Sequence, residues 1–356
     1  MTWESLAARA ARPGRCNGFG VLRLVLAVAI VAFHSYTLTH AAISGMVWQA
    51  QVAARLILPA FFAVSGYLVA GSLARCRGVG HFLVLRALRI LPALAVVVAA
   101  TALLLGPLLT SLPLAAYFAD PAVAVYFQNI VALPRFDLPG LFQANLRSGV
   151  VNGALWTIQL EVMCYVLLAA LAVVARGRML TPACAVLLLL LLFPLHAAVP
   201  AADFLACFAA GVLLQRTARR VPMHPLAGVL ALVSAFWLVT DPARLTWAVL
   251  PLAYGAVWLG TRQVPAALTH ADYSYGLYLS AYPLQQTVLH WLPAAWWLLL
   301  LIALPVGLAA AALLWHAVER PILARKRAIA ERRWSLGMAC MAAEPALAGG
   351  VVPGDG

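Results

Sequence analysis

Charged residues are scarce in this chain of 356 residues: Asp, Glu, Lys and Arg together make up 10% of it, while 65% of the residues are hydrophobic. The mean hydropathy of +0.95 lies far above the range of soluble globular proteins. Lysine is almost absent, since Lys326 is the only one and every other basic side chain is an arginine. This composition excludes a soluble globular domain and indicates an integral membrane protein.

Two further classes of protein are excluded by what the chain lacks. The net charge of +13 would suit nucleic-acid binding, but the basic residues are dispersed between hydrophobic segments and form no patch. We therefore predict no nucleic-acid partner. The six cysteines form no CxxC pair, and the eight histidines form no metal-ligand motif such as HExxH. We expect neither a disulfide framework nor a metal site.

Apolar stretches of about 17–25 residues recur along the chain, each long enough to cross a hydrocarbon core about 30 Å thick as a helix. We predict an all-α integral membrane protein, a polytopic bundle of about ten transmembrane helices embedded in the lipid bilayer. The expected spans are 19–39, 47–73, 82–106, 154–175, 179–198, 201–217, 224–240, 245–261, 273–292 and 294–318.

The distribution of arginine orients these spans. If the N-terminus is cytoplasmic, nearly all basic residues fall in inner segments, and the outer segments hold only Arg55, Arg135, Arg147 and Arg244. This asymmetry follows the positive-inside rule and predicts that both termini are cytoplasmic. No small-residue cleavage site follows the first apolar run, so we expect a retained helix and not a signal peptide.

The chain divides into three parts. Residues 1–18 are expected to form a cytoplasmic N-terminal segment, 19–323 the transmembrane domain and 324–356 a cytoplasmic tail. The tail ends in EPALAGGVVPGDG, whose small residues cannot form a packed core, so we expect disorder there. The longest interruption, about 107–153, is predicted to be an extracytoplasmic loop with a re-entrant or interfacial helix near 121–132.

Two ionisable residues interrupt the first apolar run, LRLVLAVAIVAFHSYTL. Arg23 and His34 are eleven residues apart, which is about 16 Å along a helix and nearly the same helical face. Anchoring of Arg23 at the headgroups and helix packing by His34 would explain both residues. Ionisable groups inside a membrane are nevertheless candidates for function by default.

Three more charged residues share this ambiguity. Arg86 and Arg89 are three residues apart on one helical face at the cytoplasmic mouth of the third span. They either anchor the helix or bind phosphate, for which the guanidinium fork is suited. Glu161 is expected near the depth of His34, where an unpaired carboxylate is costly and needs His34, an arginine or an aqueous cavity as a partner.

Six segments follow one another in an order that resembles the acyltransferase-3 family, bacterial multi-pass acyltransferases that modify cell-surface and exported glycans. The matching segments are RLVLAVAIVAFH (23–34), FFAVSGYL (61–68), LRALRILP (85–92), VNGALWTIQLEVMCY (151–165), SYGLYLSAYPLQQ (274–286) and VERPIL (318–323). The resemblance implies an O-acyltransferase of the bacterial cytoplasmic membrane that uses acetyl-CoA or another acyl-CoA as donor substrate and binds no permanent cofactor. A glycan or a lipid-linked sugar would be the acceptor.

The resemblance also implies roles for individual residues. His34 would be the general base that removes the proton of the acceptor hydroxyl, a usual task for neutral imidazole near pH 7. Glu161 would orient the imidazole, as carboxylates do in hydrolytic triads. The other roles are donor binding by Arg23, Arg86, Arg89, Ser65 and Tyr67, and acceptor binding by Trp156, Asn152 and Tyr278.

Structural explanations exist for most of these residues. Ser65 and Tyr67 belong to a segment of small residues that suits helix packing, and Trp156 would fit an interfacial aromatic belt. Asn152 would shape the turn into the fourth span, and Tyr278 would line a cavity. A transporter or flippase for a lipid-linked sugar or acylated metabolite is the alternative function, with His34 and Glu161 as a proton relay. The sequence does not specify the acceptor, the acyl group or the oligomeric state.

Overall fold

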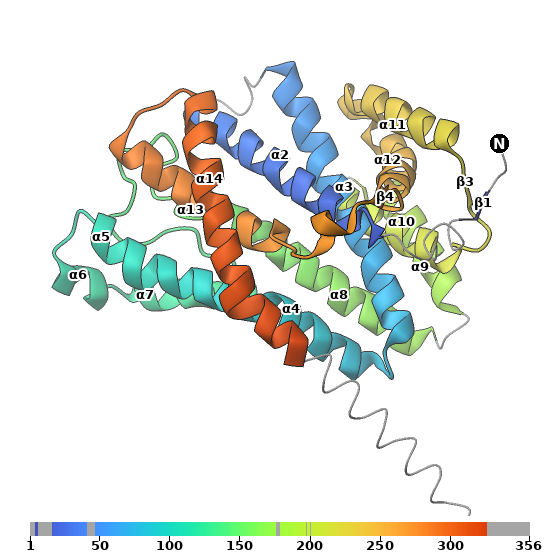
Figure 1. The fold of residues 1–356 in the computed structure, drawn as a ribbon, viewed down its shortest axis with the longest axis horizontal. Helices are drawn as coiled ribbons and strands as arrows, with labels where there is room; N and C mark the ends of the chain where they lie inside the picture. The colour runs from blue at the N-terminus through green and yellow to red at the C-terminus, as the bar shows by residue number, and fades with distance from the viewer. Residues whose placement is uncertain are drawn as a thin grey trace, which may run out of the picture.

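The computed structural model describes residues 4–5, 16–40, 47–175, 179–196, 198–199 and 201–325, which form an assembly of helices (Figure 1). Most of the expected N-terminal segment 1–18 and nearly all of the expected tail 324–356 lie outside the described residues. Each predicted span overlaps one long helix: α2 (Phe19–Thr39), α3 (Trp48–Arg75), α4 (Val79–Ala100), α8 (Trp156–Val174), α9 (Leu180–Leu192), α10 (Ala202–Arg216), α11 (Pro225–Val239), α12 (Leu245–Gly260), α13 (Ser274–Trp291) and α14 (Trp296–Leu314).

The prediction of a polytopic, all-helical membrane protein is confirmed. Among the described residues, five helical segments are long and apolar enough to cross a membrane: Phe19–Thr39, Trp48–Arg75, Val79–Leu109, Gly153–Val174 and Trp296–Arg325. The other predicted spans correspond to shorter helices, from 13 residues in α9 to 18 in α13. The loop predicted over 107–153 contains α6 (Leu114–Ala119), α7 (Pro121–Tyr126) and the 3-10 turn η2 (Phe127–Val131), so a helix is present near 121–132.

Short irregular elements complete the described chain. A π-helical turn, η1 (Thr101–Leu105), joins α4 to α5 (Gly106–Leu109), and η7 (Trp315–Glu319) continues α14 in the same way. The strand β1 (Glu4–Ser5) pairs with β3 (Pro222–Met223), and β2 (Cys16–Asn17) pairs with β4 (Gln263–Val264), both antiparallel. Single 3-10 turns are η3 (Gly153–Leu155), η5 (Pro242–Arg244) and η6 (Ala266–Thr269). The strand pairs bring the chain before α2 against the segments that follow α10 and α12.

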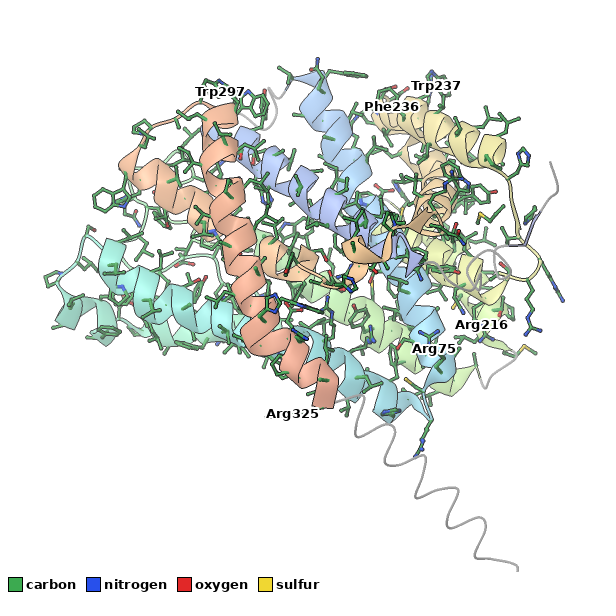
Figure 2. All side chains as sticks on the ribbon, viewed as in Figure 1. Arg75, Arg216, Phe236, Trp237, Trp297 and Arg325 are labelled. Carbon is green, nitrogen blue, oxygen red and sulfur yellow. The ribbon has the colours of Figure 1, made fainter. Side chains whose placement is uncertain are left out.

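Three arginines and three aromatic residues lie on opposite sides of the assembly (Figure 2). In Figure 2, Arg75, Arg216 and Arg325 lie toward the lower side of the view, and Phe236, Trp237 and Trp297 lie along the upper edge. We call these the arginine end and the aromatic end. The distribution matches the charge asymmetry of membrane proteins and their interfacial aromatic residues.

Two helices from opposite ends of the sequence, α2 and α13, run side by side and in parallel. Near the start of both, Arg23 pairs with Asp272 at 2.7 Å, just before α13 begins. Three turns later, the Gln285 amide donates to the Val31 carbonyl oxygen at 2.8 Å and to Ser35 Oγ at 2.7 Å. Polar bonds at both ends therefore fix how the two helices align.

The helices α3 and α10 approach each other closely at two glycines. A Cβ atom at Gly66 would lie 2.1 Å from the Phe208 carbonyl oxygen, and one at Gly211 would lie 2.0 Å from the Ala63 carbonyl oxygen. Only glycine fits such a distance, as is typical of small-residue contacts between membrane helices. This packing holds α3 against α10 and presents other α3 side chains to α2, α8 and α13.

Candidate active site

A polar cavity lies between α2, α3, α4, α8 and α13, within an otherwise apolar assembly. It consists of two adjoining hollows of about 30 and 50 Å³, enough for a few water molecules. Thr157 and Tyr278 also line the first hollow, and Arg86, Arg89 and Tyr165 also line the second, each together with three apolar side chains. The residues that line both hollows are Arg23, Phe61, Ser65, Glu161 and Tyr275.

Asp272 joins two of the predicted donor-binding arginines at one edge of this cavity. Its Oδ2 accepts from Arg23 Nη1 at 2.7 Å and from Arg89 Nη2 at 2.6 Å, while its Oδ1 accepts from Ser274 Oγ at 2.5 Å. Arg89 also donates to the buried carboxylate of Glu319. Burial raises the pKa of the Asp272 carboxyl, but the two guanidinium groups and the bonds from Ser274 outweigh it and lower the pKa to about 2.

Arg86 has different surroundings from Arg89, although the two residues share a helical face. Its Nη2 donates to Ser72 Oγ at 3.1 Å, and its guanidinium lies 6.0 Å from the ring centroids of Phe82 and Tyr165. Its buried Nε has no hydrogen-bond partner, and no carboxylate pairs with Arg86 among the described residues. Of the two arginines predicted to bind phosphate, Arg86 thus carries the uncommitted charge.

Glu161 is bonded to neighbours other than the predicted one. Tyr165, one turn further along α8, donates its hydroxyl to the Glu161 carboxylate, and Ser65 Oγ donates from 3.5 Å. Within the described part of the chain, no hydrogen bond joins Glu161 to His34. Glu161 instead lines the cavity, which is one of the partners expected for a carboxylate at this depth, and its role in orienting His34 stays a prediction.

His34 lies further toward the aromatic end, beyond the cavity. Its half-buried ring packs edge-on against Tyr282 of α13, with ring centroids 5.1 Å apart and planes at 80°. Neither ring nitrogen has a hydrogen bond to another described residue. Tyr282 follows Tyr278 by one turn on the same face of α13, and Tyr278 lines the cavity. Along α2, Arg23 is followed by His34, and along α13, Tyr278 is followed by Tyr282, which contacts His34. These two helices therefore connect the lining of the cavity to His34.

The three residues predicted to bind the acceptor have separate surroundings. Trp156 is 37% exposed and packs edge-on against Phe204 at 5.7 Å. Asn152 is fully buried: its Oδ1 accepts from the Ala154 backbone N–H at 3.2 Å, and its Nδ2 donates to the Leu279 carbonyl at 2.9 Å. These bonds cap the turn before α8 and tie it to α13, so both polar atoms of Asn152 are engaged.

Two tyrosines differ in their access to the cavity. The hydroxyl of Tyr278 bonds to Thr157 Oγ1 and to the Ala154 carbonyl at 3.0 Å, and its ring lines the cavity. Tyr67 does not line either hollow; it is buried and stacks on Phe19 with centroids 5.2 Å apart. Residues two apart on a helix face different directions, which explains why Ser65 lines the cavity and Tyr67 does not.

Asp272, Glu319 and Tyr165 were not identified from the sequence as site residues. A usable signal existed, because the chain has only 11 acidic residues, and two of them stand at the ends of apolar segments. Asp272 directly precedes the segment SYGLYLSAYPLQQ, and Glu319 lies inside VERPIL. An acid at such a position is a natural partner for a membrane arginine.

Comparison with known proteins identifies the family of the chain. A family model described as an acyltransferase domain matches residues 17–316. An O-acetyl transferase of Shigella phage Sf6 is 25% identical over 340 residues, covering 87% of this chain and 97% of the relative. Nodulation protein 10 of Rhizobium leguminosarum bv. viciae is 27% identical over 381 residues, covering 91% of this chain and 97% of the relative. No solved structure matches the chain.

Proposed function

Because the chain belongs to the acyltransferase 3 family and is an O-acyltransferase, we propose that it moves an acetyl group from cytoplasmic acetyl-CoA to a hydroxyl of a cell-surface glycan or lipid-linked sugar. The acetyl group is favoured because the relative from Shigella phage Sf6 is an O-acetyl transferase. The observation that carries the proposal is the cavity with arginines at one edge, together with a histidine further along α2 whose ring contacts Tyr282.

The donor enters from the arginine end, which we assign to the cytoplasm of the bacterial inner membrane by the positive-inside rule. Arg86 offers an uncommitted guanidinium to a phosphate of coenzyme A, since Ser72 is its only polar partner among the described residues. Arg23 and Arg89 are held in place by Asp272 and add positive potential at the same edge of the cavity. The thioester then lies deeper, toward Glu161 and Tyr278.

His34 acts as the general base at the far end of this path. An imidazole nitrogen accepts the proton of the acceptor hydroxyl while the hydroxyl oxygen attacks the thioester carbonyl carbon. The new C–O bond forms, the C–S bond breaks, and coenzyme A leaves as a thiolate that takes up the proton. The ring of His34 is oriented by its packing on Tyr282, and it has no competing hydrogen bond among the described residues.

Glu161 has a positioning role in this scheme. Its carboxylate holds the hydroxyl groups of Tyr165 and Ser65, and Tyr165 in turn lies against the Arg86 guanidinium. The three side chains therefore shape the wall past which the donor arm travels. Because the two hollows hold only a few waters, the arm has to displace side chains, of which Phe61 lines both.

The test uses the full chain purified into nanodiscs. Release of free coenzyme A thiol from acetyl-CoA is followed with an envelope glycan extract as acceptor, and the glycan mass of a deletion strain is compared with that of wild type. We expect thiol release that depends on the acceptor, and a loss of 42 Da units, about one acetyl group each, from the deletion strain's glycan. Folded protein that neither binds nor turns over acetyl-CoA would contradict the proposal.

A further inference from the structure

A separate hollow, outside the cavity of the candidate active site, lies at the arginine end. It has a volume of about 510 Å³, within the usual range of ligand sites. We call it the basic hollow, and its lining includes Thr181, Gln215, Arg216, Arg219 and Arg220. Three arginines thus surround a space large enough for a small molecule.

The chain turns back on itself where these arginines stand. After α10 ends, the backbone N–H groups of Arg220 and Val221 both donate to the Thr217 carbonyl oxygen, at 2.8 and 3.1 Å. This tight turn keeps Arg219 and Arg220 at the rim of the hollow, where both side chains are exposed. Arg216 is held from the other side, because its Nε donates to Thr181 Oγ1 at 3.2 Å.

The arginines of the basic hollow are candidates for binding an anion. No ion pair joins Arg219 or Arg220 to a carboxylate in the described part of the chain, so their guanidinium groups are open to an anion. Guanidinium binds phosphate through paired, charge-assisted hydrogen bonds. A phospholipid headgroup offers a single phosphate, whereas the nucleotide part of coenzyme A offers a diphosphate and a 3′-phosphate, which suits a cluster of arginines better.

The basic hollow is also adjacent to the donor end of the cavity. A Cβ atom at Gly71 would lie 3.4 Å from Arg75 Nη1 and 3.6 Å from Gln215 Nε2, so Gln215 of the hollow packs against α3 at this residue. The next residue, Ser72, accepts the hydrogen bond from Arg86, which lines the cavity. The two sites are thus separated by about one helix width, roughly 10 Å, which a pantetheine arm spans.

We propose that the basic hollow binds the adenosine 3′,5′-bisphosphate part of the acyl-CoA donor, while the outer phosphate of the diphosphate bonds to Arg86 and the pantetheine arm continues into the cavity. This inference rests on the proposed function, because it divides one donor between two sites. The nucleotide stays at the arginine end, and only the arm and the acyl group enter the membrane domain. Affinity for the donor therefore comes from Arg219 and Arg220 together with Arg86, which also positions the pantetheine arm and its thioester.

The experiment compares three probes on the full chain in nanodiscs: acetyl-CoA, adenosine 3′,5′-bisphosphate and acetyl-pantetheine. Affinities are measured by titration calorimetry for wild type, Arg219→Ala and Arg220→Ala. We expect each substitution to weaken binding of the first two probes about tenfold, the effect of one lost charge-assisted contact, with no change for acetyl-pantetheine. The matched control is Arg262→Ala, which removes a charge stacked on Trp258 outside the hollow. This substitution should leave the affinities for all three probes unchanged.

The outcomes separate this inference from the proposed function. If wild type fails to bind acetyl-CoA, the proposed function is wrong. If wild type binds acetyl-CoA and the Arg219 and Arg220 variants bind it equally well, the basic hollow is not the nucleotide site, although the function stands. A variant that loses retention of phosphatidylglycerol in mixed nanodiscs but keeps its affinity for adenosine 3′,5′-bisphosphate would show a lipid site and also overturn the inference.

Discussion

Arg23 and Asp272 are 249 positions apart in the sequence, yet Arg23 Nη1 lies 2.7 Å from Asp272 Oδ2. Arg89 reaches the same oxygen from α4, so one carboxylate holds two guanidinium groups together. Without Asp272 these like charges would repel each other in a site that is largely shielded from water. The donor end of the cavity therefore depends on a residue that precedes α13.

Replacing this aspartate tests its structural role. Asp272→Asn leaves Arg23 without a carboxylate partner and Arg89 with Glu319 alone, and we expect a loss of about 2–3 kcal/mol in stability, below the range for fully buried pairs because the Asp272 side chain is 24% exposed. Thermal unfolding in detergent measures the change. The control is Asp241→Asn, which breaks an exposed pair with Arg244 and should cost under about 1 kcal/mol. Equal effects of the two substitutions would contradict this interpretation.

The same residue predicts a pH dependence of stability. The folded-state pKa of Asp272 is about 2, below the usual value of about 3.9. A lowered carboxyl pKa contributes stability that is fully present above the unfolded-state pKa and is lost as pH falls through the folded-state pKa. The difference in melting temperature between wild type and Asp272→Asn should thus be constant from about pH 5 to 8 and shrink below about pH 4. A difference that stays constant down to pH 3 would argue against this prediction.

Arg86 and Arg89 should respond differently to substitution. Arg89→Ala leaves Asp272 and Glu319 without a main partner and should mainly lower the melting temperature. Arg86→Ala loses the bond to Ser72 and the contacts with the Phe82 and Tyr165 rings but leaves no carboxylate unpaired, so it should still fold and should bind acetyl-CoA about ten times more weakly. Arg86→Lys should restore part of the affinity, because a point charge does not replace the bidentate fork. If Arg86→Ala binds the donor as tightly as wild type, Arg86 anchors the helix and does not bind phosphate.

His34→Ala should abolish acetyl transfer while the protein still accumulates in the membrane. Loss of a general base typically lowers the rate about 10²–10⁴-fold. The assay is transfer to the envelope extract, normalised to protein amount, with binding of acetyl-CoA measured in parallel and expected to be unchanged. His224→Ala, at the exposed start of α11, is the control for removal of an imidazole. Near-wild-type transfer by His34→Ala would rule out the assigned role.

Glu161 and Tyr165 should behave as one unit. Because the Tyr165 hydroxyl donates to the Glu161 carboxylate, Glu161→Gln and Tyr165→Phe each disturb the same bond. We expect the double variant to be scarcely worse than the more damaging single variant, measured by kcat and KM for acetyl-CoA. Multiplicative effects of the two substitutions would show that they act independently.

The sequence predicted the helices well because their cause is local. An apolar run long enough for a membrane leaves the backbone no alternative to internal hydrogen bonds, so all ten predicted ranges coincide with helices. The ends were less predictable: α9 ends at Leu192, before the proline and histidine of the segment that follows, although the apolar pattern favours an end at 198.

The site was only partly predictable, because its pairings depend on how helices rotate against one another. Arg23, Ser65, Arg86, Arg89, Glu161 and Tyr278 were all recognised and all line the cavity. The hydrogen bonds of Glu161 to Tyr165 and Ser65 were not predicted, since the depth of a residue along a helix does not determine which neighbouring helix its side chain faces. Asp272 was missed because it lies in a connecting segment, and no local pattern links it to an arginine 249 positions earlier.

The parallel alignment of α2 and α13 has a consequence for how the protein is made. Arg23 and Arg89 leave the ribosome long before Asp272 and Glu319, the carboxylates that neutralise them. At a synthesis rate of about 5–20 residues per second, Arg23 waits roughly 10–50 s for its partner. During that interval the first helices carry uncompensated cations, which remain near the lipid headgroups because charge is costly in hydrocarbon. The donor end of the cavity therefore assembles last, when α13 and α14 arrive.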